Sequence, residues 1–169
     1  MSSLTAFVRL DNATTTLIFD CQGRMPTLIY YGQQLNNATT QEMLALLNTR
    51  QEAKCAPVIE PPISLVPTHG EGVTGSPGLE ISGDADQWSA GFTLSNIEQA
   101  DTSVTFTAVD ADRKMQLITR VVLDAETTVA TFTSSIENQG ESTLQLNYLN
   151  AARLALPTTM STSKSFEGK

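Results

Sequence analysis

Basic residues are scarce in this chain of 169 residues. Ten lysines and arginines stand against eighteen aspartates and glutamates, which gives a formal net charge of −8. A surface of this sign repels the phosphate backbone of nucleic acids and the anionic headgroups of membranes. The chain also lacks an apolar run of the roughly 18 residues that a membrane-spanning helix needs. The sequence therefore predicts neither a nucleic-acid-binding protein nor a membrane protein.

Residues that commonly build metal or catalytic sites are few. There is one histidine, His69, and the two cysteines, Cys21 and Cys55, stand in no zinc-ligand pattern. Their spacing neither predicts nor excludes a disulfide between them, and two free thiols are the simpler interpretation. The first residues lack the basic and apolar regions of a secretory signal, so we expect a cytoplasmic protein. We accordingly interpret the glycosylation motifs at Asn12 and Asn37 as chance matches, and we expect no cofactor.

Alternation of apolar and hydroxyl-bearing residues predicts β-strands through most of the chain. Between residues 102 and 109, Val104, Phe106 and Ala108 share one face, and threonines and a serine occupy the other. Comparable runs cover residues 4–10, 14–21, 25–31, 115–122, 127–137 and 143–156. The run at 115–122 becomes apolar on both faces, as is typical of a strand near the centre of a sheet. Short turns without helical crossovers, including a tight hairpin turn at 22–24, predict an all-β antiparallel sandwich.

One segment, residues 40–52, is expected to be helical. Thr39 and Glu42 have the spacing of a capping box, and an apolar stripe at i, i+3 and i+4 follows them. The stripe consists of Met43, Leu46 and Leu47. We expect this stripe to face the core.

The candidate site residues lie in a stretch rich in proline and glycine, residues 56–84. Such a stretch predicts either an edge segment that wraps around the sheets or a functional loop. His69 and Glu71 occur there in the sequence Pro67-Thr-His-Gly-Glu-Gly72 and could form an acid/base pair. One histidine with one acid makes neither a catalytic triad nor a three-ligand metal site. A surface or interface role for His69 is therefore the simpler interpretation.

The other acidic residues cluster at predicted turns, where aspartate accepts local backbone hydrogen bonds. The clusters are Asp84 with Asp86, Asp110 with Asp112, and Asp124 with Glu126. Glycoside hydrolysis needs two opposed carboxylates about 5–10 Å apart, which this pattern does not predict. Trp88 and the three tyrosines could form a sugar-stacking platform, but aromatics total 6% and lie in or beside strands, which favours packing. The residues alone thus predict a β-sandwich without an active site of its own.

Several segments, in order, resemble the N-terminal domain of glycoside hydrolase family 36, the bacterial α-galactosidases. Gly23-Arg-Met-Pro-Thr-Leu-Ile-Tyr-Tyr-Gly32 is similar to the family's hairpin, which leads into an L-x-Y-W-G strand, with Tyr31 in place of tryptophan. Residues 65–79 resemble the family's Y-P-x-Y-G-x-x-D-F-R-x-P-A loop, and residues 151–157 resemble its A-x-S-A-x-L-D-L-P segment. This chain departs from the pattern at residues 73–75, Val-Thr-Gly, which replace D-F-R, and at the aspartate of D-L-P, which is alanine here.

The resemblance implies an antiparallel β-supersandwich of the galactose mutarotase-like type, with one short α-helix, over residues 1–157. It implies that residues 158–169 are a linker toward a catalytic (β/α)8 barrel outside this chain. In such enzymes the barrel carries both catalytic aspartates and the reaction retains the anomeric configuration. The implied function is a non-catalytic domain that supports the barrel and a homo-oligomer, with α-galactosides bound by the parent enzyme. The segment 35–67 is the one expected to reach a neighbouring subunit's sugar pocket, and no catalytic residue is assigned in this chain.

Two other functions compete with this interpretation. A free-standing carbohydrate-binding module would share the β-sandwich and would bind sugars through exposed aromatic residues. A sugar mutarotase would share the supersandwich, but such enzymes rely on several histidines with a glutamate base. The single His69 disfavours that second alternative.

Overall fold

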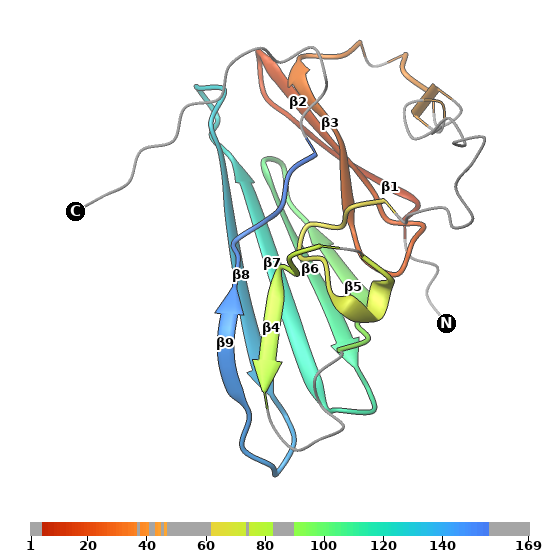
Figure 1. Cartoon of the computed structure of the whole chain (residues 1–169). Helices are drawn as coiled ribbons and strands as arrows, with labels where there is room; N and C mark the ends of the chain where they lie inside the picture. Colours follow the sequence, from red (N-terminus) through yellow and green to blue (C-terminus); the bar gives the residue numbers. More distant parts are fainter. Residues whose placement is uncertain are drawn as a thin grey trace.

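The computed structural model describes residues 5–36, 38–40, 43–44, 46, 62–73, 75–82 and 90–155. Their strands are β1 (Phe7–Asp11), β2 (Thr15–Asp20), β3 (Thr27–Gln33), β4 (Leu79–Ser82), β5 (Thr93–Gln99), β6 (Ser103–Asp110), β7 (Met115–Leu123), β8 (Ala130–Asn138) and β9 (Gln145–Leu149). They form three antiparallel sheets in the orders β1-β2-β3, β4-β9 and β5-β6-β7-β8 (Figure 1). Within these residues no helix is long and apolar enough to cross a membrane. The predicted all-β class is confirmed.

The four-stranded sheet forms one layer, and the two smaller sheets share its inner face. Val104, Phe106 and Ala108 alternate along β6 and are at most 2% exposed. Val104 and Phe106 pack in one core cluster with residues of β1, β2 and β3, whereas Ala108 packs in a second cluster with residues of β4. Because these three residues point to the same side of β6, the two smaller sheets lie against successive parts of one face.

An aromatic contact connects the two layers in the first cluster. Phe19 of β2 and Phe106 of β6 meet edge to face, with ring centroids 5.3 Å apart and an interplanar angle of 63°. Both side chains are almost completely buried. Edge-to-face pairs of this kind contribute about 0.5–1.5 kcal/mol beyond the burial of their apolar area. The contact therefore stabilises the layered arrangement as well as each sheet.

Most predicted strands are present, with shifted ends. The strand at 115–122 lies between β6 and β8, as its two apolar faces predicted. The prediction missed β5 entirely and β4 inside the Pro/Gly-rich stretch, because β4 has only four residues. The strand predicted at 143–156 is confined to Gln145–Leu149, since Asn150 and Arg153 donate backbone hydrogen bonds to the loop carbonyls of Gly78 and Leu65.

The turn between β2 and β3 is also different from the prediction. The connection runs from residue 21 to residue 26 and not through a tight turn at 22–24. Met25 is buried in the second core cluster, and the carbonyl of Pro26 accepts a hydrogen bond of 2.9 Å from the Leu65 N–H. Tertiary contacts thus widen this loop beyond the local turn preference.

The prediction that the apolar stripe faces the core is wrong for the two stripe residues that the structure describes. Met43 and Leu46 are helical, but their exposed fractions are 55% and 72%, whereas Leu44 is 6% exposed. The hydroxyl of Thr40 accepts a hydrogen bond from the Met43 N–H at 3.3 Å, so the capping hydroxyl lies one residue after the predicted cap, Thr39. The other predicted cap and stripe residues, Glu42 and Leu47, lie outside the described residues.

Replacement of Phe106 by alanine tests the contact between the layers. The variant should lose about 3–5 kcal/mol in the free energy of unfolding, because the deleted ring leaves a cavity between the sheets. Urea unfolding followed by circular dichroism measures this loss. Thr107→Ala, on the opposite face of β6, is the matched control and should change stability by less than about 0.5 kcal/mol. Equal losses in the two variants would contradict the assignment of the inner face.

Candidate functional site

Both candidate site residues lie in a single short turn. The 3-10 turn η1 (His69–Glu71) follows Thr68 and ends at Gly72, whose φ of 81° is in the left-handed region that favours glycine. Glu71 Oε1 accepts hydrogen bonds from the Thr68 N–H at 3.0 Å and from the Thr68 hydroxyl at 3.1 Å. This is the carboxylate arm of a capping box, so one oxygen of Glu71 holds the turn itself.

His69 points into solvent at the start of this turn. The residue is exposed, and no hydrogen bond among the described residues involves its imidazole. The oxygen of Glu71 that has described partners bonds to Thr68. The structure therefore places the two candidates two residues apart without bringing their side chains into an acid/base contact.

Gly70 lets the η1 turn approach another segment of backbone. A Cβ atom at this position would lie 2.2 Å from the carbonyl oxygen of Ala90 and 3.2 Å from the Cα atom of Gly91. No side chain fits in that space. The glycine in the middle of the sequence motif is thus explained by packing between two chain segments.

Beneath this turn lies a small cavity of about 150 Å³. Its lining includes Asp20, Arg24, Met25, Ser64 and Glu71. Burial raises the pKa of Glu71, and the opposing effects of the Ser64 and Thr68 hydrogen-bonding groups and of the Arg24 charge do not cancel it. The cavity thus combines a partly desolvated carboxylate, a hydroxyl and a guanidinium group.

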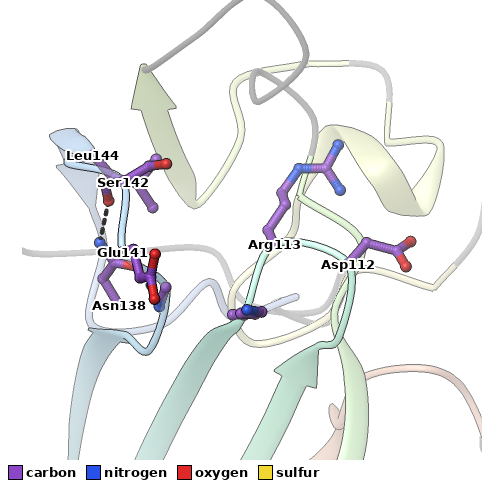
Figure 2. A pocket seen from close by; sticks show the side chains of 8 residues that line it. Asp112, Arg113, Asn138, Glu141, Ser142 and Leu144 are labelled. Atoms are coloured by element: carbon purple, nitrogen blue, oxygen red, sulfur yellow. Dashed lines mark hydrogen bonds between the residues drawn. The ribbon is translucent and has the colours of Figure 1, made fainter.

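A larger and more open cleft of about 580 Å³ lies at the far ends of β6, β7 and β8. Six of its lining residues are labelled in Figure 2: Asp112, Arg113, Asn138, Glu141, Ser142 and Leu144. Asp112 and Arg113 belong to the β6–β7 turn, Asn138 is the last residue of β8, and the other three belong to the segment between β8 and β9. Asn138 Nδ2 donates a hydrogen bond of 2.8 Å to the Ser142 carbonyl, so this amide holds its own turn (Figure 2). The lining therefore contains charges of both signs, with the acids Asp112 and Glu141 on different segments and the cation Arg113 beside Asp112 in the chain.

Asp110 anchors the rim of that cleft. Its side chain is 3% exposed and accepts hydrogen bonds from the backbone N–H groups of Gly91 (2.8 Å) and Arg113 (3.1 Å). The Arg113 guanidinium lies 3.2 Å from the same carboxylate. Burial alone would raise the pKa of Asp110, but these donors together hold it below its usual value. Asp110 is therefore an ionised structural group, as the turn cluster predicted.

Two other acidic side chains also contact backbone N–H groups or a neighbouring cation. Asp124 Oδ1 accepts from the N–H groups of Glu126 at 3.0 Å and Thr127 at 2.8 Å, and these bonds keep the pKa of Asp124 low. Asp11 pairs with Arg9 at 2.6 Å. Within the part of the chain that the structure describes, no group of three His, Cys, Asp or Glu side chains is placed to hold a metal ion. Asp84 and Asp86 lie outside it.

The tyrosines do not form one aromatic platform. Tyr30 and Tyr31 are consecutive on β3, so they point to opposite faces of that strand, and Tyr148 lies on β9 in another sheet. The Tyr31 hydroxyl donates to the Thr128 carbonyl at 2.5 Å. Trp88, the remaining member of the hypothetical platform, lies outside the described residues.

The glycosylation motif at Asn12 has a structural use. Asn12 Nδ2 donates to the carbonyls of Asp124 at 2.7 Å and Thr127 at 2.6 Å, which joins the β1–β2 turn to the β7–β8 turn. Its Oδ1 accepts from the N–H groups of Thr14 and Thr15 at 2.9 and 2.7 Å. A glycan on Nδ2 would replace one of these donor hydrogens.

Known proteins share the sequence pattern and the fold of this chain. The family model for the glycosyl hydrolase family 36 N-terminal domain matches residues 24–169. The solved α-galactosidase of Lactobacillus brevis superposes with a TM-score of 0.72 at 15% identity, over 89% of this chain and 24% of that enzyme. The family 36 α-galactosidase AgaB of Geobacillus stearothermophilus superposes with a TM-score of 0.68 at 12% sequence identity, over 86% of this chain and 23% of that enzyme. This chain thus spans about a quarter of the length of either enzyme. No curated protein matches the sequence.

The close approach at Gly70 can be tested by adding a single methyl group. Gly70→Ala should lower the free energy of unfolding by about 1–3 kcal/mol, because the new Cβ atom must displace the Ala90 backbone. Gly23→Ala is the matched control, since its Cβ atom would meet nothing closer than the Met25 carbonyl oxygen at 3.7 Å. That control should stay within about 0.5 kcal/mol of the parent protein. Thermal unfolding that ranks the two variants in the opposite order would refute the packing role.

Cys21 provides a test based on pH. Burial, together with the nearby charge of Asp20, raises the pKa of this thiol from 9.0 to about 12, and the thiol is free. At pH 8 its alkylation by iodoacetamide should be about a thousandfold slower in the folded protein than in urea. Because the folded pKa is raised, the stabilising contribution of the neutral thiol is complete below pH 9 and is lost as the pH rises toward 12.

Mass spectrometry of the tryptic peptides follows Cys21 separately from Cys55, which lies outside the described residues. The same protein in urea is the internal control for reagent activity. Comparable rates for Cys21 in the folded and unfolded protein would show that this thiol is not buried.

Proposed function

This chain belongs to the glycosyl hydrolase family 36 N-terminal domain family, and we propose that it acts as the non-catalytic N-terminal domain of a cytoplasmic α-galactosidase. The parent enzyme would cleave terminal α-galactosides with retention of the anomeric configuration. Its two catalytic carboxylates would lie on a barrel domain outside this chain, joined through residues 158–169. The domain itself would support that barrel and the contacts between subunits.

The use of the carboxylates is the observation that carries this proposal. Retaining hydrolysis needs one carboxylate free to attack the sugar and another, about 5 Å away, free to transfer a proton. Asp110 is held by three donors, Asp124 caps its turn, and Glu71 caps η1 through one oxygen. Acids that stabilise loops in this way are not arranged as an opposed catalytic pair.

The lengths of the compared proteins support the same conclusion. The solved α-galactosidases contain about four times as much chain as the part that superposes on this protein. The names of those proteins assign α-galactosidase activity to the complete enzymes. A division of labour between this domain and the additional chain accounts for both the shared fold and the use of Asp110, Asp124 and Glu71 in stabilising turns.

Exposed apolar side chains on β9 are suited to a contact with the barrel or with another subunit. Leu146 and Tyr148 are 48% and 51% exposed, although both are large and lie on one short strand. Among the described strands β9 pairs only with β4, beside which it runs in Figure 1. Burial of these two side chains in the parent enzyme would remove apolar area from water and thus favour assembly.

The start of the segment proposed to reach a neighbouring sugar pocket is fixed to the sheet. The Arg9 guanidinium donates to the carbonyls of Leu35 at 2.6 Å and Asn36 at 3.3 Å. Asp11 orients this guanidinium through hydrogen bonds of 2.6 and 3.0 Å. The segment that begins at residue 35 therefore leaves β3 from a defined point, as a loop that contributes to another subunit's site would require.

Activity measurements on two forms of the protein test this proposal. The 169-residue chain should show no turnover of a nitrophenyl α-galactoside, whereas the complete gene product should hydrolyse it. Proton NMR of the product released first should show the α-anomer of galactose. Turnover by the short chain, free of contaminating enzyme, would overturn the non-catalytic role, and a complete product without activity would overturn the α-galactosidase assignment.

A further inference from the structure

The small cavity beneath η1 contains a buried polar group whose hydrogen-bonding capacity the described residues do not fill. Ser64 is 1% exposed and lines the cavity, and its Oγ makes no hydrogen bond of ordinary length and angle to any described residue. It lies close enough to Glu71 to favour that residue's carboxylate form, although the two groups do not meet the distance and angle of an ordinary hydrogen bond. A buried hydroxyl without a partner is costly, and such groups usually bond to water or to a ligand.

The groups around this hydroxyl define the chemistry of a ligand. Asp20 and Glu71 would repel an anion, and the Arg24 guanidinium offsets part of the attraction that these acids would exert on a cation. A neutral molecule with hydroxyl groups can use all of these groups, since each hydroxyl can donate to a carboxylate and accept from a guanidinium or from Ser64. Met25 supplies an apolar surface against which the C–H groups of such a molecule can pack.

The shape of the cavity indicates the size of a ligand and the route by which it would enter. Its volume of about 150 Å³ is roughly that of five water molecules in the liquid. Ser64, Asp20 and Met25 are buried and form the closed end, whereas Gly23 and Arg24 are exposed and form the mouth. A short polyol or a single sugar ring matches these dimensions.

We propose that this cavity binds a small neutral polyol or a monosaccharide, with Ser64 and Glu71 as its principal hydrogen-bonding groups. Glu71 offers its second carboxylate oxygen, because Oε1 already accepts both hydrogen bonds from Thr68. The inference goes beyond the proposed support of a catalytic barrel and does not depend on it. The site would be separate from the place where the glycosidic bond is cleaved.

Titration calorimetry of the 169-residue chain with galactose and with glycerol tests this site. We expect saturable binding of at least one of the two at millimolar concentration, and Ser64→Ala should weaken it about tenfold, the effect of one lost hydrogen bond. Because the Ser64 hydroxyl has no described partner, Ser64→Ala should leave the thermal unfolding midpoint of the free protein unchanged or raised. Ser142→Ala, in the separate cleft of Figure 2, is the matched control and should bind like the parent chain.

Three results would overturn the proposal. They are the absence of saturable binding of either compound, binding that Ser64→Ala does not weaken, and equal weakening by Ser64→Ala and Ser142→Ala. Glu71→Gln gives a second measurement, since the amide keeps the acceptor for Thr68 but removes the charge. It should weaken binding while the chain stays folded, and unchanged affinity in this variant would also count against the site. None of these results bears on turnover, so failure here is distinguishable from failure of the proposed function.

Discussion

The fold depends on one constraint, the burial of a single apolar face of the four-stranded sheet by two smaller sheets. β6 and β7 supply this face by strict alternation, and Phe106 on β6 contacts Phe19 on the opposite layer. The two-stranded sheet is too small to form a core alone, since β4 and β9 contain four and five residues. The long strands therefore act as a common support, and loss of their inner face would separate all three sheets.

The connecting loops are arranged by the same packing. The loop between β2 and β3, the segment around η1 and the residues before β5 meet through backbone contacts. The Leu65 N–H bonds to the Pro26 carbonyl, the Leu94 N–H bonds to the Arg24 carbonyl, and Gly70 touches Ala90. Three segments far apart in sequence thus become neighbours. The small cavity lies where two of them, the β2–β3 loop and the η1 segment, come together, which is why residues as distant as Asp20 and Glu71 line one space.

Several acidic residues of the chain stabilise local structure. Asp110, Asp124 and Glu71 each accept hydrogen bonds from nearby backbone N–H groups, and such bonds stabilise turns that connect long strands. A domain built in this way can be strongly acidic without an acidic active site. This fits a supporting domain whose parent enzyme carries out its chemistry on other parts of the chain.

The sequence by itself determined the strand class, the inner face of β6 and the turn role of Asp110, because alternation and turn chemistry depend on near neighbours. Its family motifs also predicted the family that the comparison confirms. It did not predict β5, the outward orientation of Met43 and Leu46, or the cavity that joins Ser64 to Asp20. Those features depend on which distant segment covers each residue, and only the packing of the three sheets decides that.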